Sequence, residues 1–403
     1  MNASRRSCAG FTIIEALIAT LIMAATTAAV FALLDPARGV FQTQPEAVDM
    51  QQRLRVGVDA LTHDLLMAGA GAYSGAQSGS LIGYFAPILP FRQGRSAAYD
   101  DGAGVFTTNA VTILYVPSTA SQTTIHGAMT AASSTIAINN ESGCPLNGAT
   151  ADPVCGFKAN TTKAVVYDTT GAFDTFAIAS VNAAAGQLTL QHTQQGTLSK
   201  TYPDQAKIVE AARHVYFLDA ATKQLVHYDG LSPAAVVLDN VIALNFEYYG
   251  EAAPPAFRRP GEDQTVTYGP APPEPGVTQS PWAAGENCTW QMIGGQQVTR
   301  LASLGGMTTG PASLVTLTAA ELTDGPWCPD AVNTNRYDAD LLRIRKVRVT
   351  IRLQTGNAAL RGSLTAGTGA LFANAGTATS AARTVSDQAV RFDVSPRNMN
   401  LGR

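Results

Sequence analysis

The sequence predicts an α+β protein in which a long N-terminal helix precedes a large, mostly antiparallel β-rich head with insertions. Three observations lead to this prediction. An apolar run extends from Phe11 to Leu34, a helical repeat of apolar residues continues to Gly69, and short runs of alternating or β-branched residues follow over 70–403. Strands that succeed one another without intervening helices favour antiparallel pairing.

Size and charge set the first limits on function. The chain has 403 residues, of which 14% are charged, and a formal net charge of −3. A chain of this length can bury a large core, as one domain or as two lobes. This weakly acidic balance gives no electrostatic footprint for nucleic acid, so the sequence predicts no nucleic-acid partner.

The N-terminus combines a short basic leader, MNASRRSCAG, with the apolar run FTIIEALIATLIMAATTAAVFALL. A helix over Phe11–Leu34 rises about 1.5 Å per residue, which is enough to cross the hydrocarbon core of a bilayer. Glu15 is the one charged residue in this run. A charge at the centre of a membrane helix costs on the order of 2.5–3.5 kcal/mol, so Glu15 requires an explanation.

Three kinds of export signal explain this N-terminus poorly. A cleaved secretory signal would have a shorter apolar core, with a cleavage region near Ala25–Ala29, and a glutamate near the front of that core is unusual. A twin-arginine signal would use Arg5 and Arg6, but no apolar pair follows them directly. A lipoprotein signal needs its cysteine after the apolar stretch, whereas Cys8 precedes it.

The motif GFTIIEALIA explains every residue, because Gly10 is followed by Phe11 and, at the fifth position, by Glu15. It resembles the class III signal of type IV prepilins and pseudopilins. The resemblance implies that a membrane-embedded peptidase removes residues 1–10 by cutting after Gly10, and methylates the new amine of Phe11. It also implies that Glu15 pairs with the N-terminal amine of a neighbouring subunit, since a nearby cation offsets the cost of a buried carboxylate. If Gly10 were absent, the preferred interpretation would be that the Glu15 side chain merely extends to the lipid headgroups.

The predicted helix changes character after its membrane-like part at 11–34. Asp35–Pro36, Gly39 and Pro45 predict that the chain is weakened or kinked there. Over 35–69 an amphipathic helix is expected, with its charged residues mostly away from the apolar stripe and its end at Gly69. The stripe consists of Met50, Leu54, Val58, Leu61 and Leu65, and the charged residues are Asp49, Arg53, Arg55, Asp59 and Asp64. The glycines that follow lack the flanking elements of a phosphate-binding loop and predict a flexible turn.

The remaining runs predict strands. They lie at 110–116, 135–139, 163–168, 175–181, 187–192, 214–219, 224–229, 241–249, 346–353 and 390–394. The strands at 214–219 and 224–229 are joined by AATK and predict a hairpin. In KVRVTIRL (346–353), alternation predicts one packed and one wet face. Two regions look inserted: a possible β subdomain at 118–205 and a Pro/Gly-rich surface loop at 251–335.

The cysteines indicate an oxidising compartment. Once the leader is removed, four remain: Cys144 and Cys155 around a short loop, and Cys288 and Cys328 around a Pro/Gly-rich segment. Pairing of neighbours, Cys144–Cys155 and Cys288–Cys328, is the simplest of three connectivities and predicts two disulfides. No CxxC spacing occurs, so neither a zinc site nor a thioredoxin-like site is expected.

The sequence predicts no enzyme, no catalytic residue, no cofactor and no metal. The histidines show no HxH or HExxH spacing. His214 and His227, on the two arms of the predicted hairpin, would supply two ligands at best. No GxSxG motif is present. Asp219, Asp338 and Asp340 lack the spacing of a calcium loop.

The order of the segments extends the resemblance. DALTHDLLMAGAG, HVYFLDAATKQLVHYDG, LDNVIALNFEYYG and RKVRVTIRLQT before a final PRN resemble PilW-type minor pilins, with a pseudopilin-J-like head. This implies a single-pass protein of the bacterial inner membrane, with a periplasmic head, that later joins a pilus filament at the cell surface as a low-copy tip or priming subunit. The implied partners are a prepilin peptidase/methyltransferase, other minor and major pilins, an inner-membrane assembly platform and, before assembly, membrane lipid. A minor pseudopilin of a type II secretion or DNA-uptake system is the alternative, and an exported binding protein or enzyme anchored by its helix is a more distant one.

Overall fold

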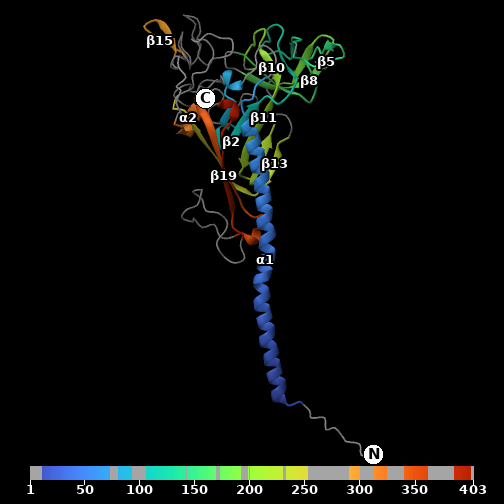
Figure 1. Ribbon diagram of the computed structural model, residues 1–403, viewed down its shortest axis with the longest axis vertical. Helices are drawn as coiled ribbons and strands as arrows, with labels where there is room; N and C mark the ends of the chain where they lie inside the picture. The colour runs from blue at the N-terminus through green and yellow to red at the C-terminus, as the bar shows by residue number, and fades with distance from the viewer. Residues whose placement is uncertain are drawn as a thin grey trace, which may run out of the picture. The chain divides into compact units, whose positions relative to one another are not determined.

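A computed structural model shows the predicted α+β architecture, a long N-terminal helix followed by an antiparallel β-rich domain (Figure 1). For residues 32–42, 92, 106, 190, 191, 290, 291, 297–299, 323, 324 and 359 the structure describes the backbone and not the side chain. The chain divides into two compact units, 1–53 with 354–388 and 54–353 with 389–403. The described residues are 11–72, 80–92, 106–141, 143–168, 173–191, 198, 200–229, 233–252, 290–299, 313–324, 340–361 and 385–400.

Helix α1 (Ile13–Met67) runs without interruption through the point where the sequence predicted a weakened or kinked helix. Pro36 and Pro45 both lie inside it. A proline lacks only its own N–H, so the backbone bonds of the adjacent turns remain and the helix can continue. The predicted end at Gly69 is confirmed, because this residue takes a φ of 81° and donates its N–H to the carbonyl of Leu114 at 3.0 Å.

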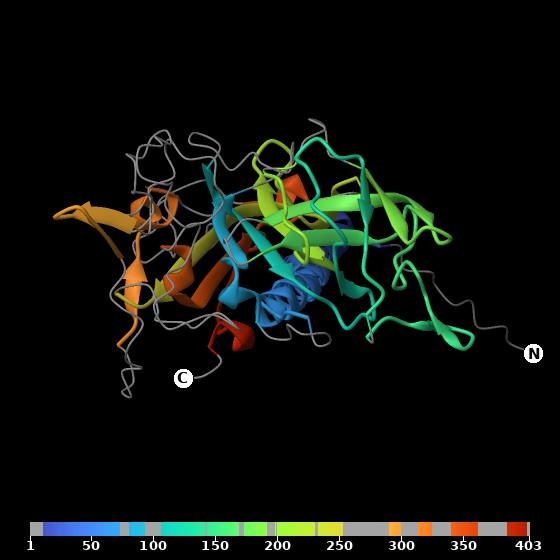
Figure 2. The same cartoon turned by 90° about the horizontal axis from the view of Figure 1, so that it is seen from above.

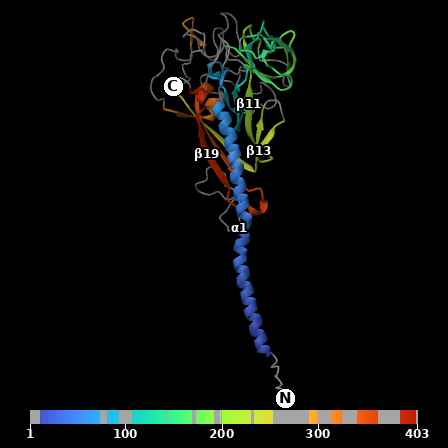
Figure 3. The ribbon, with the colours of Figure 1, turned by 45° about the vertical axis from the view of Figure 1, so that its right-hand side comes forward.

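Four members of the predicted apolar stripe of α1 are buried, namely Met50, Leu54, Leu61 and Leu65, and Val58 is half-buried. Gly57 lies on this side of the helix, and a Cβ added to it would stand 2.4 Å from Leu238 Cδ1 of strand β13 (Ala235–Asp239). The C-terminal part of α1 accordingly lies alongside β11 and β13 (Figure 3). Asp64 departs from the prediction, because it is only 4% exposed.

The sheet beside this part of α1 has the strand order β1-β2-β11-β12-β13. Its other members are β1 (Ile88–Arg92), β2 (Phe106–Tyr115), β11 (Ala212–Asp219) and β12 (Gln224–Tyr228). The predicted hairpin is confirmed by the antiparallel pairing of β11 with β12. One face carries an apolar cluster of Ala110, Val215, Phe217 and Val226. Because side chains alternate along a strand, Tyr115, His214, Tyr216 and His227 belong to the other face.

The region predicted as a β subdomain forms its own sheet, with the order β3-β10-β7-β8-β9-β4 (green in Figure 2). The strands are β3 (Gln122–Thr124), β4 (Thr135–Ala137), β7 (Lys163–Tyr167), β8 (Phe173–Asn182), β9 (Gln187–Gln191) and β10 (Lys207–Glu210). A separate apolar core that includes Ile125, Ile178 and Ile208 packs with it. The sheet therefore extends slightly beyond residue 205, through β10.

A third sheet has the order β17-β14-β18-β19. Its strands are β14 (Val241–Gly250), β17 (Val315–Leu317), β18 (Ile344–Leu353) and β19 (Gln388–Val394). The packed face of β18 is confirmed, because Val347, Val349, Ile351 and Leu353 are all 0% exposed. The opposite face is only partly wet, since Thr350 is buried as well.

The range 251–335, predicted as a surface loop, contains regular structure among its described residues. It holds a hairpin of β15 (Trp290–Ile293) and β16 (Gln296–Thr299), strand β17 and helix α2 (Ala319–Asp324). Each element has six residues or fewer, so its pattern was too short to stand out among the surrounding Pro and Gly residues. The described residues also include the 3-10 helices η1 (Leu81–Gly83), η2 (Leu341–Arg343), η3 (Ala358–Leu360) and η4 (Arg397–Met399).

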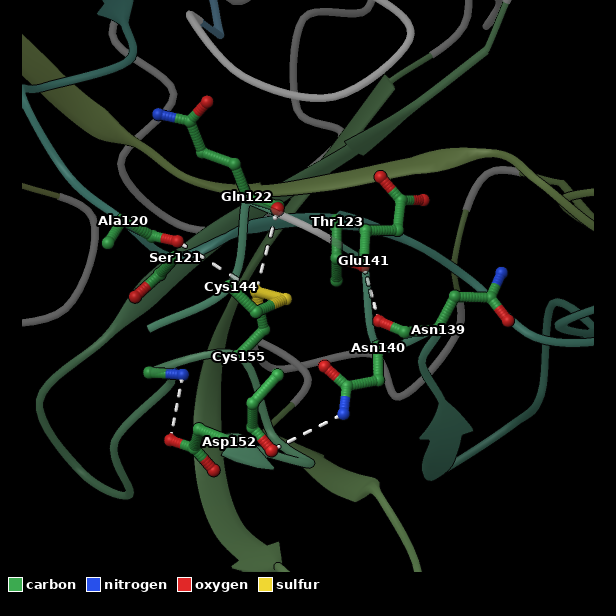
Figure 4. Close-up of a disulfide and its surroundings, with 12 residues drawn as sticks. Ala120, Ser121, Gln122, Thr123, Asn139, Asn140, Glu141, Cys144, Asp152 and Cys155 are labelled. Atoms are coloured by element: carbon green, nitrogen blue, oxygen red, sulfur yellow. Dashed lines mark hydrogen bonds between the residues drawn. A yellow bond between two sulfur atoms is a disulfide. The ribbon is translucent and has the colours of Figure 1, made fainter. Parts of the chain in front are cut away.

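The disulfide predicted between Cys144 and Cys155 is present, with Cα atoms 4.6 Å apart (Figure 4). The two cysteines flank the small hairpin of β5 (Leu146–Asn147) and β6 (Thr150–Ala151). Asp152 turns the chain back by accepting the N–H groups of Val154 and Gly156 at 3.1 and 3.0 Å. Cys288 and Cys328, predicted as the second pair, lie outside the described residues, as does Gly10.

Candidate functional site

The N-terminal part of α1 exposes an apolar surface on all sides. The segment Ile13–Phe31 has a mean hydropathy of 2.0, none of it is buried, and it is long and apolar enough to cross a membrane. A secretory signal sequence would have the same property. Its large exposed side chains are Ile13, Ile14, Leu17, Ile18, Leu21, Ile22, Met23, Val30 and Phe31. A helix that is apolar all round requires lipid or other protein around it, rather than water.

The first turn of α1 is closed by a reciprocal pair of hydrogen bonds. Thr12 donates its backbone N–H to Glu15 Oε2 at 3.0 Å, and Glu15 donates its own N–H to Thr12 Oγ1 at 3.3 Å. The Thr12 hydroxyl also donates to Glu15 Oε2, at 2.9 Å. This is a capping box, which satisfies backbone donors that a helix leaves unpaired at its start. The sequence TIIE carries the Thr-x-x-Glu signal for this box, so Glu15 has a capping role in addition to the predicted ion pair.

The capping box occupies one carboxylate oxygen of Glu15 and leaves the other available. Among the described residues, Glu15 Oε1 has no hydrogen-bond partner. The N-terminal end of a helix also favours negative charge, because its backbone N–H groups point outward there. Glu15 therefore stays an acceptor for an external cation while it caps its own helix. Phe11, the predicted new N-terminus, is 87% exposed and precedes the first helical residue.

Comparison with models of known protein families and with curated protein sequences finds no match for this chain. The interpretation of the N-terminal site therefore depends on the residues and their geometry.

The two histidines of the predicted hairpin do face each other. His214 Nδ1 and His227 Nε2 lie 2.8 Å apart, and Asp64 Oδ2 of α1 lies 3.1 Å from the same His214 nitrogen. Burial lowers the pKa of both histidines, while the carboxylate of Asp64 acts in the opposite direction. Sequence reasoning missed Asp64 as their neighbour. Its position three residues after Leu61 and seven after Gly57 places it on the buried stripe, which was a usable signal.

The acidic residues considered as calcium ligands have other partners. Asp219 accepts the backbone N–H groups of Ala221 and Thr222, and so shapes the turn between β11 and β12. Asp340 is fully buried and pairs with Arg343 at 3.2 Å. Asp338 lies outside the described residues. Neither described carboxylate belongs to a cluster of oxygen ligands of the kind that calcium requires.

Proposed function

We propose that this chain is a minor pilin of the PilW type, a low-copy subunit that enters a type IV pilus through the N-terminal part of α1. The observation that supports this most strongly is the combination of an exposed apolar helix with a glutamate at its start, where Oε1 has no described partner. The leader motif ends in Gly10, and this glutamate is the fifth residue after it. The expected processing is cleavage after Gly10 and methylation of Phe11 by a prepilin peptidase/methyltransferase.

The chemistry of assembly follows from these groups. Before assembly, membrane lipid would cover the apolar surface of Ile13–Phe31. In a filament, the helices of neighbouring subunits would replace the lipid. Cleavage creates a cationic amine at Phe11, and a buried carboxylate is tolerated only when a cation is close to it. The amine of one subunit and Glu15 Oε1 of the next would therefore fix the axial register of the two helices.

The β-rich head fits a position at the tip better than one repeated along a fibre. It includes most of the 403 residues, and a head of that size is hard to repeat in a thin filament. At the tip, the subunit would prime assembly together with other minor and major pilins on an inner-membrane platform. The energy would come from a separate ATPase, because the sequence has no nucleotide-binding motif. The chain would first reside in the inner membrane, with its head in the periplasm.

The mature N-terminus tests the first step. Mass spectrometry of the protein isolated from its own cells should identify an N-methylated Phe11 as the first residue. A start near Val30 would indicate secretory cleavage, and an intact Met1 would indicate a simple anchor; either result would refute the proposal. Deletion of the gene then separates the two assembly machines, because loss of surface pili supports the pilus and loss of secreted enzymes supports a pseudopilus.

A further inference from the structure

Asp64, His214 and His227 bring three ligand atoms together within one unit of the fold. The atoms are Asp64 Oδ2 on α1, His214 Nδ1 on β11 and His227 Nε2 on β12, and all lie within 4.8 Å of one another. The strand register explains the two histidines: Tyr216 is paired with His227, so His214 lies diagonally across the hairpin on the same face. A carboxylate and two imidazoles are ligands that zinc and related ions accept.

The hydrogen bonds around Asp64 determine which atoms of this cluster carry protons. Tyr115 donates its hydroxyl proton to Asp64 Oδ1 at 3.1 Å, and Tyr216 donates to Asp64 Oδ2 at 2.6 Å. A carboxylate only accepts, so the proton of Tyr115 is committed to Asp64. The oxygen of Tyr115 then accepts from His214 Nε2, which lies 3.1 Å away. Neutral His214 therefore has its proton on Nε2 and a lone pair on Nδ1.

This assignment leaves the centre of the cluster rich in electron pairs. The lone pair of His214 Nδ1 faces Asp64 Oδ2 at 3.1 Å, where no proton lies between them. His227 Nε2 lies 2.8 Å from the same nitrogen and, without a metal, donates its ring proton to it; moving that proton to the other ring nitrogen frees Nε2 as a ligand. Three acceptor atoms can thus be directed at one point. Such a point attracts a cation.

We propose that Asp64, His214 and His227 form a binding site for a divalent transition-metal ion of the zinc type. At bond lengths of about 2.0–2.1 Å, tetrahedral ligands of zinc lie roughly 3.3 Å apart. The distances of 2.8 and 3.1 Å are a few tenths of an ångström shorter, so small side-chain rotations would admit the ion. His214 is 21% exposed in its side chain and His227 is half-buried, which leaves room for water as a fourth ligand.

Neighbouring side chains hold the proposed ligands in position. Metal-binding residues are usually held by hydrogen bonds from their other atoms. Here Tyr115 and Tyr216 hold Asp64, and Tyr115 holds His214 through a hydrogen bond and a stacked ring with centroids 5.3 Å apart. The bound ion would join α1 to the hairpin β11–β12. Because it would bind the folded state preferentially, it would stabilise this unit of the protein.

The test uses the full-length protein in detergent, titrated with Zn²⁺ against a chromophoric chelator. The wild type should bind one equivalent with high affinity, and Zn²⁺ should raise its Tm. His227→Gln removes one ligand without touching the bonds of Asp64 to the two tyrosines, and should weaken binding at least about 10–100-fold. The matched control is His126→Gln, because His126 is exposed and its ring makes a hydrogen bond with Asn139 Oδ1 at 3.1 Å, away from the proposed site. This control should bind Zn²⁺ like the wild type.

Two results would overturn the site: a wild type that binds no Zn²⁺ with a defined stoichiometry, or equal affinity in the wild type and His227→Gln. Circular dichroism without metal establishes that the variant folds. If His227→Gln does not fold, Co²⁺ binding to the wild type tests the site, because tetrahedral ligation of Co²⁺ gives intense visible absorption. An intense band supports the site, and a weak octahedral spectrum refutes it. This site stands independently of the proposed role in pili.

Discussion

Helices α1 and α2 begin with the same motif but differ in what surrounds it. In α2, Thr318 donates its N–H to Glu321 Oε2 at 2.9 Å, and Glu321 donates its N–H to Thr318 Oγ1 at 3.3 Å. The corresponding distances for Thr12 and Glu15 in α1 are 3.0 and 3.3 Å. In α2, however, Arg343 donates to the second oxygen, Glu321 Oε1, at 3.0 Å. In α1, Glu15 Oε1 has no such partner among the described residues.

This difference shows that capping uses only one of the two carboxylate oxygens of the glutamate. The second oxygen of Glu321 is used by a buried arginine of the same chain, which also donates to the carbonyl of Glu251 and to Asp340. At the start of α1, a cation would have to come from outside the described chain. The contrast separates two roles of the same residue type, closing a helix and receiving a charge, and substitutions can test each role separately.

The largest effect is expected from Glu15. Glu15→Gln keeps an oxygen that can cap the helix but removes the charge, whereas Glu15→Ala removes both. Leaving a buried charge without its partner costs about 3–5 kcal/mol, equivalent to at least a hundredfold at about 1.4 kcal/mol per factor of ten. Both variants should therefore be processed normally and yet be nearly absent from sheared filaments, as measured by immunoblotting. Normal assembly of Glu15→Gln would show that only the cap matters.

Arg343→Met should break the α2 arrangement. Asp340, which is fully buried, and Glu321 would both lose this cation. Removal of one member of a buried ion pair costs about 3–5 kcal/mol, so the free energy of unfolding should fall by that order in denaturant titrations of the full-length protein. Arg391→Met, on an exposed position of β19, is the control and should change stability by less than about 0.5 kcal/mol. Equal effects of the two substitutions would contradict the assigned role of Arg343.

Loss of the threonine should have a smaller effect that is similar in both helices. Replacing a capping threonine by alanine costs about 0.5–2 kcal/mol. Thr318→Ala should lower the free energy of unfolding by this amount, and Thr318→Ser, which keeps the hydroxyl, should not. Thr12→Ala should leave Glu15 Oε1 charged, so filament incorporation should persist. A Thr12→Ala phenotype as severe as that of Glu15→Gln would mean that the two roles cannot be separated.

The smallest effect is a pH dependence. The hydrogen bond from the backbone N–H of Thr318, more than any other cause, lowers the pKa of Glu321. A carboxyl group whose pKa is lower in the folded state contributes stability above its unfolded pKa and loses it as pH falls through the folded pKa. The wild type should therefore lose slightly more stability than Glu321→Gln as the pH is taken below the usual range of glutamate. Parallel pH profiles of the free energy of unfolding would contradict this.

Local patterns in the sequence predicted most of the secondary structure because strands such as KVRVTIRL carry their period within a few residues. The Cys144–Cys155 disulfide could be predicted for the same reason, because only 11 positions separate the two cysteines. The contact of Asp64 with His214 could not be predicted from a local pattern. The two residues are 150 positions apart, and only the packing of α1 on the sheet brings them together. The uninterrupted course of α1 was missed for the opposite reason. The local signal of Pro36 was given more weight than the neighbouring turns that continue the helix.

The short separation of Cys144 and Cys155 has a kinetic consequence. A loop of about ten residues closes in roughly 10–100 ns, before distant strands such as β3 and β10 can meet. Closing a loop about twelve times longer, as a bond from Cys155 to Cys288 would require, costs about 2 kcal/mol more in chain entropy. The nearer thiol therefore encounters Cys155 first and more often. In the unfolded chain, chain entropy therefore favours the Cys144–Cys155 bond over a bond from Cys155 to Cys288.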